Sequence, residues 1–98
     1  MDTSNALDLA GLIRKAAHDG RLNTSHMSIY IALLNCWLEQ GYPQKFTITR
    51  KKLMELAKIG AISTYHRSIK QLIAYGYIVY IPTYDHYTGT KVSLTSCQ

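Results

Sequence analysis

Apolar positions in the first half of the chain repeat at helical spacing. Within residues 25–40, one stripe at i, i+3, i+4 and i+7 steps is formed by Met27, Tyr30, Ile31, Leu34, Trp37 and Leu38. A second stripe is formed by Ile29, Leu33 and Cys36. We expect a helix over residues 25–40, capped by Thr24 or Ser25. Because it is apolar on two sides, this helix should lie at the centre of the domain.

A shorter amphipathic helix is expected over residues 6–18. Its apolar face is formed by Leu9, Leu12, Ile13, Ala16 and Ala17. Thr3 or Ser4 can cap its start, and the Asp19-Gly20 pair ends it. We therefore divide the chain into an N-terminal helical extension, residues 1–22, and a main domain, residues 23–98.

The second half of the chain begins with a short strand and two short helices. Residues 46–48 alternate in polarity after a turn, which predicts a strand. Thr49 then caps a helix over residues 50–58, and Ser63 caps a helix over residues 64–75. The predicted inner faces are Leu53, Leu56 and Ala57 in the first of these helices and Tyr65, Ile69, Leu72 and Ile73 in the second.

A β-hairpin is expected to close the domain. Residues 77–81 and 91–94 are rich in β-branched and aromatic residues, and they flank a polar loop that contains Gly89. The predicted order is helix, helix, short strand, helix, turn, helix, hairpin. The expected fold class is therefore mainly α with a C-terminal β-hairpin.

Charge is distributed unevenly along the chain. The 98 residues carry a formal net charge of +5. Residues 1–41 contain three cations and four acids, whereas residues 42–98 contain eight cations and two acids. A basic half beside a nearly neutral half indicates one surface that faces a polyanion.

Several classes of function lack their sequence signatures. The apolar runs are too short for a membrane span, and the start of the chain has no signal-peptide pattern. Cys36 and Cys97 have no CxxC or metal-ligand spacing, which is typical of a cytoplasmic protein. No nucleophile motif, carboxylate pair or phosphate-binding loop is present. We expect no catalytic residues, no metal site and no small-molecule cofactor.

Two helices joined by a tight turn and followed by a hairpin are the parts of a winged helix-turn-helix. The run Ser63-Thr64-Tyr65-His66-Arg67-Ser68-Ile69-Lys70-Gln71-Leu72, then Gly76-Tyr77-Ile78, resembles the recognition-helix pattern of bacterial winged-helix regulators. The run Leu53-Met54-Glu55-Leu56-Ala57 is similar to the first helix of their motif, where a small residue lets the helices cross closely. The resemblance implies a winged helix domain over residues 23–98 with an extra N-terminal helix.

The chain also resembles small winged-helix proteins of bacterial mobile, conjugative elements. Thr64-Tyr65-His66, Gly76-Tyr77-Ile78 and Tyr80-Ile81-Pro82-Thr83-Tyr84 carry this resemblance. It implies a winged-helix fold and a setting in a mobile element. Together with the resemblance to bacterial regulators, it implies a transcriptional regulator that binds double-stranded DNA.

The expected DNA-binding residues lie on both helices of the motif and on the hairpin. A recognition helix fits the major groove, while the preceding helix approaches the phosphate backbone. Three consecutive cations at the start of the helix over residues 50–58 oppose its macrodipole, which favours a phosphate partner. The expected contacts are Thr49, Arg50, Lys51, Lys52, Ser63, Thr64, His66, Arg67, Lys70 and Lys91.

We expect a homodimer that binds two half-sites about one helical turn apart. The N-terminal helix and the second stripe of the helix over residues 25–40 are predicted to form the dimer contact. The same residues also suit an accessory protein of DNA replication, excision or transfer. A winged helix that serves as a protein-interaction module is a third alternative, against which the basic half of the chain argues.

Overall fold

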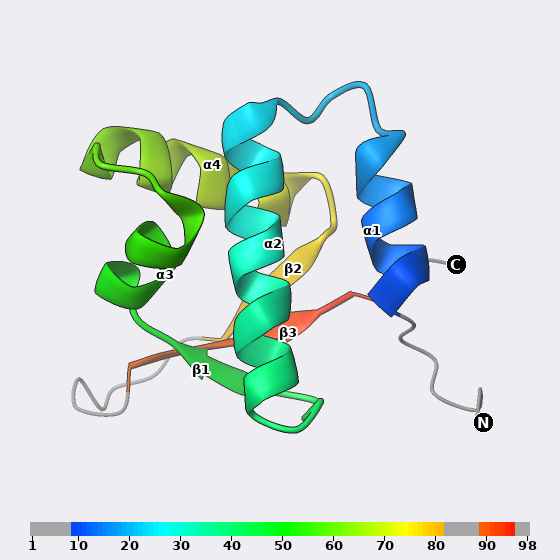
Figure 1. The fold of residues 1–98 in the computed structure, drawn as a ribbon, viewed down its shortest axis with the longest axis vertical. Helices are drawn as coiled ribbons and strands as arrows, with labels where there is room; N and C mark the ends of the chain where they lie inside the picture. Colours follow the sequence, from blue (N-terminus) through cyan, green and yellow to red (C-terminus); the bar gives the residue numbers. More distant parts are fainter. Residues whose placement is uncertain (1–8, 82–88, 96–98) are drawn as a thin grey trace.

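The computed structural model describes residues 9–81 and 89–95. Its elements, in chain order, are α1 (Leu9–Ala17), α2 (Thr24–Glu39), β1 (Phe46–Ile48), α3 (Arg50–Ala57), α4 (Ile62–Ala74), β2 (Ile78–Ile81) and β3 (Thr90–Leu94). Figure 1 shows α2 at the centre, with α1 on one side and α3 and α4 on the other. The predicted order of elements is confirmed, and the fold is that of a winged helix-turn-helix with an extra N-terminal helix.

The central helix α2 buries its second predicted stripe completely and its first only in part. It packs against α1, α3, α4 and β1, so its neighbours surround it on several sides. The second stripe is fully inside, with Ile29 and Leu33 at 0 % exposure and Cys36 at 2 %. In contrast, Ile31 and Leu38 of the first stripe are exposed. The second stripe is therefore part of the core of a single chain, and its assignment to a dimer contact is wrong.

The start of α2 is fixed by a reciprocal pair of hydrogen bonds. The side chain of Asn23 accepts from the backbone N–H of His26 at 3.0 Å, and His26 Nδ1 accepts from the backbone N–H of Asn23 at 2.9 Å. Asn23, and not Thr24 or Ser25, is thus the cap. His26 is buried, and its Nε2 lies 2.6 Å from Gln71 Oε1 on α4. Since Nδ1 accepts, Nε2 carries the proton and donates to Gln71.

The turn between α3 and α4 is tight, and it begins at Lys58, two residues before Gly60. Thr49 caps α3 as predicted, by accepting from the backbone N–H of Lys52. The helix ends at Ala57, and the next residue, Lys58, adopts the left-handed conformation with φ 62°. The Ser28 hydroxyl on α2 donates a hydrogen bond to the backbone carbonyl of Ala57. Ala57 itself is 4 % exposed. A small residue at this position therefore lets α3 approach α2 closely.

The structure corrects three predictions about α3 and α4. The helix α4 starts at Ile62 and its cap is Ala61, whose side chain makes no capping hydrogen bond. Ser63 is therefore inside the first turn, because the chain enters the helix before it. Ile73 and Leu56, predicted as inner residues, are 37 % and 38 % exposed. Each lies at the border of its helix's apolar face, where no neighbouring element covers it fully.

The sheet joins the predicted hairpin to the short strand β1. Its order is β1-β3-β2, with both pairings antiparallel. Val92 of β3 faces Phe46 on one side and Tyr80 on the other, so these three share one face of the sheet. Gly89, directly before β3, has φ +80°, and a Cβ there would lie 2.9 Å from the carbonyl oxygen of Ile48. Only glycine fits this approach without a backbone shift.

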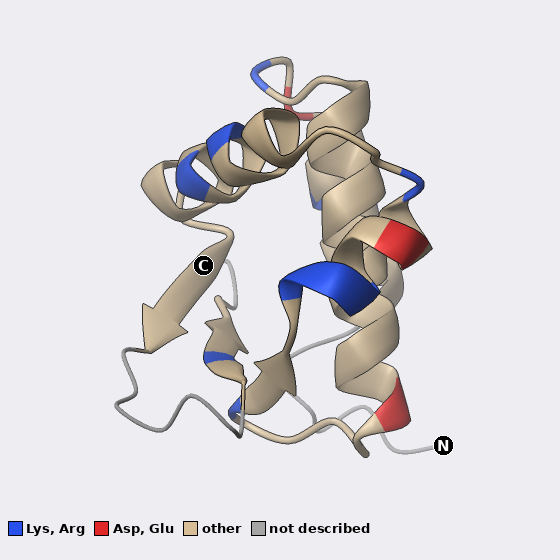
Figure 2. Ribbon diagram, turned by 90° about the vertical axis from the view of Figure 1, so that its left-hand side faces the viewer, with Lys and Arg blue, Asp and Glu red and all other residues tan. Residues whose placement is uncertain are grey.

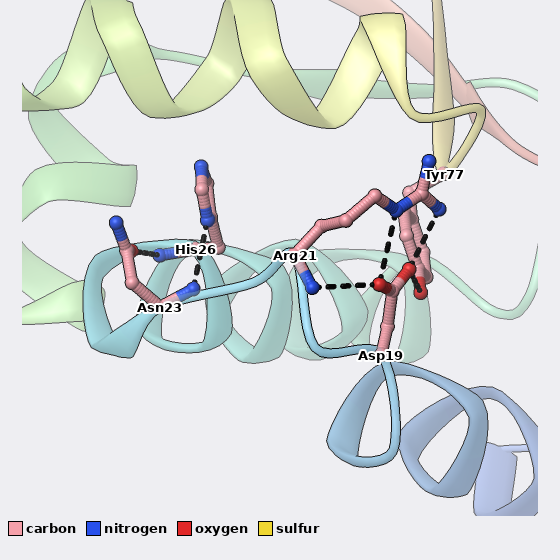
Figure 3. A network of polar contacts seen from close by, with 5 residues as sticks. All are labelled: Asp19, Arg21, Asn23, His26 and Tyr77. Atoms are coloured by element: carbon pink, nitrogen blue, oxygen red, sulfur yellow. Dashed lines mark hydrogen bonds and ion pairs between the residues drawn. The ribbon is translucent and has the colours of Figure 1, made fainter.

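A polar network ties the loop between α1 and α2 to the residue before β2 (Figure 3). The carboxylate of Asp19 accepts from the Arg21 guanidinium at 2.7 and 3.0 Å and from the Tyr77 hydroxyl at 2.7 Å. These donors, with the backbone N–H of Arg21, hold the pKa of Asp19 well below its ordinary value. The Arg21 guanidinium also stacks over the ring of Tyr75. The network thus connects the N-terminal extension to the wing.

Candidate nucleic-acid interface

The outer face of α4 carries a polar stripe. The inner residues Tyr65, Ser68, Ile69 and Leu72 are buried against the core. Ser63, Arg67 and Lys70 lie at i, i+4 and i+7, which places them together on the opposite side, and all three are exposed. The amphipathic pattern of the helix therefore sets which side chains point outward.

Thr64 and His66 flank this stripe on its two sides. They are two residues apart, so their side chains diverge on a regular helix. Thr64 is half-buried, while His66 is exposed with its ring edge against Tyr65 at 5.3 Å between ring centres. The prediction that both share one face with Arg67 therefore needs refinement: His66 borders the wing side of the stripe and Thr64 the other.

Two cations of α3 lie beside the start of α4. Arg50 and Lys51 are exposed and line a groove of about 390 Å³ that also reaches Ile62 at the start of α4. Figure 2 shows the Lys and Arg positions of α3 and α4 along the same side of the molecule. Thr49, directly before them, is exposed and uses its hydroxyl oxygen to cap α3.

Lys52 is directed toward α2. Its Nζ lies 3.0 Å from Glu39 Oε1, and this contact lowers the pKa of Glu39 and raises that of Lys52. Helical neighbours such as Lys51 and Lys52 point in different directions. The structure thus separates Lys52 from the surface that holds Arg50 and Lys51.

Lys91 lies on the other face of the sheet from α4. Its neighbour Val92 is buried with 0 % exposure, and successive side chains of a strand point to opposite faces. The Lys91 ammonium lies 3.4 Å from the hydroxyl of Thr47, its cross-strand partner. Lys91 is therefore not brought together with the stripe on α4. Most of the predicted wing loop lies outside the described residues.

Among the described residues, Arg50, Lys51, Arg67 and Lys70 form no ion pair, although Glu55 lines the same groove as Arg50 and Lys51. The ion pairs in this part of the chain are Arg21–Asp19 and Lys52–Glu39. We define the basic face by six exposed side chains. Arg50, Lys51, His66 and Lys70 line two grooves that share Arg50, and Ser63 and Arg67 lie with Lys70 on the outer stripe of α4.

The structure adds a feature that the sequence did not indicate. A second groove, lined by Tyr80 of β2 and Ile73 of α4, runs along one side of the basic face. Alternation along β2 can place Tyr80 on the inner face of the sheet, but periodicity does not show whether a neighbour covers it.

Two further findings concern other kinds of site. Within residues 9–81 and 89–95, no three His, Cys, Asp or Glu side chains gather as a metal site. No helix in that part is long and apolar enough to cross a bilayer. Comparisons with protein-family models, curated proteins and solved structures give no match to this chain.

Proposed function

We propose that this protein binds duplex DNA in a sequence-specific way, with α4 as the recognition helix. The observation that carries the proposal is the basic face, where Arg50 and Lys51 of α3 and Lys70 of α4 line two grooves that share Arg50, and Arg67 lies beside Lys70 on the outer stripe of α4. An exposed helix of this kind fits the major groove, where base edges present distinguishable donors and acceptors.

The basic face divides into two roles in this proposal. Arg67 and Lys70, near the middle of α4, reach base edges or the flanking phosphates. Arg50 and Lys51, at the start of α3, neutralise phosphates of the backbone. Arg67 is suited to guanine, because its guanidinium can donate two hydrogen bonds to O6 and N7.

The biological role we propose is transcriptional regulation in a bacterial mobile element, with the protein acting as a homodimer. The support for this role is the resemblance of the recognition-helix and wing sequences to such proteins. A dimer places two copies of α4 in successive major grooves on one side of the duplex.

The test of DNA binding is a fluorescence-anisotropy titration of random-sequence duplex at about 50 and 200 mM salt. Phosphate contacts release counterions, so affinity should fall steeply between the two salt concentrations. Lys51→Ala should weaken binding. It should also reduce the slope of log affinity against log salt concentration by about 1, the value for one lost phosphate contact. Lys52→Ala is the matched control on the same helix, and its effect should be smaller because Lys52 is paired with Glu39.

Two outcomes of this titration would count against the proposal. Absence of binding at low salt, or binding that ignores salt, would favour a winged helix that recognises another protein. Equal effects of Lys51→Ala and Lys52→Ala would show that the basic face is wrongly assigned.

A further inference from the structure

A groove of about 460 Å³ lies between α4, the start of α3 and the outer ends of β2 and β3. Tyr80 faces the same side of the sheet as the fully buried Val92, yet it is 47 % exposed. The core therefore leaves the space over Tyr80 open, and Ile73, 37 % exposed, lines the same groove from α4. The volume is in the range that holds a small organic ligand.

The walls of the groove are apolar and aromatic. Tyr65 and Ile69 line it next to Ile73 and Tyr80. Exposed apolar side chains that converge on one concave surface are a common feature of small-molecule sites.

The polar part of the groove is cationic. Arg50 reaches it from α3, and His66 and Lys70 reach it from α4. Neither Arg50 nor Lys70 has a carboxylate partner within the described residues. The described residues that line the groove include no Asp or Glu, so the charge of this lining is complementary to an anion.

We propose that this groove binds a small aromatic molecule with one acidic group, such as a carboxylate or sulfonate. The ring lies between Ile73 and Tyr80, and the acid lies near Arg50 and Lys70. Since these two cations also belong to the basic face, an occupied groove weakens DNA binding. That competition rests on the proposed function, whereas binding of the aromatic acid does not.

The experiment is a fluorescence titration with 1-anilinonaphthalene-8-sulfonate, an aromatic sulfonate, on the folded full chain. Lys70→Gln should weaken saturable binding by about tenfold, as expected for loss of one charge-assisted contact. Lys51→Gln removes the same charge outside the groove and should change affinity less than about twofold.

A second pair of variants tests the apolar wall. Ile73→Ser should weaken probe binding by about tenfold, since it removes a wall contact of several methyl and methylene groups. Val79→Ser is the control, because Val79 is exposed on β2 but points to the opposite face of the sheet from Tyr80. Circular dichroism checks that all four variants keep the fold.

Non-saturable binding, or equal effects within either matched pair, would overturn the groove assignment. Duplex DNA added to the complex should displace the probe, and failure to displace it while DNA binds would overturn the competition. If DNA binds but the probe does not, the inference fails alone. If the probe binds as expected but DNA does not, the proposed function fails and the groove remains a ligand site.

Discussion

The charged form of the Asp19 carboxylate is stabilised by contacts that exist only in the folded protein. Its folded-state pKa is depressed, first by the Arg21 guanidinium and then by the Tyr77 hydroxyl. The unfolded value is about 3.9. Stabilisation from these contacts is thus fully present at neutral pH and is lost as pH falls from about 5 toward the folded-state pKa.

The corresponding variant is Asp19→Asn. It should lower the free energy of unfolding at pH 7, and the gap to the wild type should shrink as pH falls below about 5. Urea unfolding at a series of pH values measures this gap. Glu55→Gln is the control, since Glu55 is an exposed acid outside both ion pairs of the described residues. A gap between wild type and Asp19→Asn that does not change with pH would contradict the assignment.

The sequence could predict residue roles where they follow from helical periodicity or, as at Thr49, from the preference of threonine for helix caps. It placed Tyr30 and Trp37 in the core correctly, because helical spacing fixes the inner face. It did not predict that the His26 side chain would bond Gln71 on α4, or that Asp19 would accept a hydrogen bond from Tyr77. Such contacts join residues 45 and 58 positions apart, and no local pattern records them.

At the scale of elements, the two helices of the motif start in different ways. The side chain of Thr49 caps α3, whereas Ser63 lies inside α4 and caps nothing. Thr49→Ala should therefore lower the free energy of unfolding by about 1 kcal/mol. Ser63→Ala should change it by less than about 0.5 kcal/mol. Chemical denaturation of both variants tests this, and a loss at Ser63 equal to that at Thr49 would contradict the observed helix start.

The elements themselves were largely predictable. Alternation and helical spacing gave every helix and strand in the described part within a few residues of its bounds. The start of α4 was misplaced because serine favours caps only statistically, while here the tight turn brings the chain into the helix at Ile62. The pairing of β1 with β3 was not predicted, since register across 44 residues depends on tertiary packing.

Across the whole molecule, only part of the predicted DNA-binding set forms one surface. The charge imbalance between the two halves predicted a single surface that faces a polyanion. It could not show that Lys52 pairs with α2 or that Lys91 lies behind the sheet. Those placements follow from helix rotation and strand alternation in three dimensions.

The expected dimer now needs a different contact. Leu12 and Ala16 of α1 are buried in the core, so we place the contact instead on Ile31 and Leu38 of α2, two of the exposed large apolar side chains, which lie seven residues apart on one face. Leu38→Lys should shift the protein from dimer to monomer in sedimentation equilibrium. Leu56→Lys, at a similarly exposed leucine of α3, should not. A wild-type monomer, or a dimer that Leu38→Lys leaves intact, would contradict this contact.

Selection of bound sites from random duplex DNA tests the central claim most directly. We predict enrichment of a palindromic sequence whose half-sites are about 10 base pairs apart, and loss of preference at one position of each half-site with Arg67→Ala. That loss should amount to about 1–3 kcal/mol of discrimination. Recovery of no preferred sequence, or the same preference from wild type and Arg67→Ala, would contradict α4 as the recognition helix.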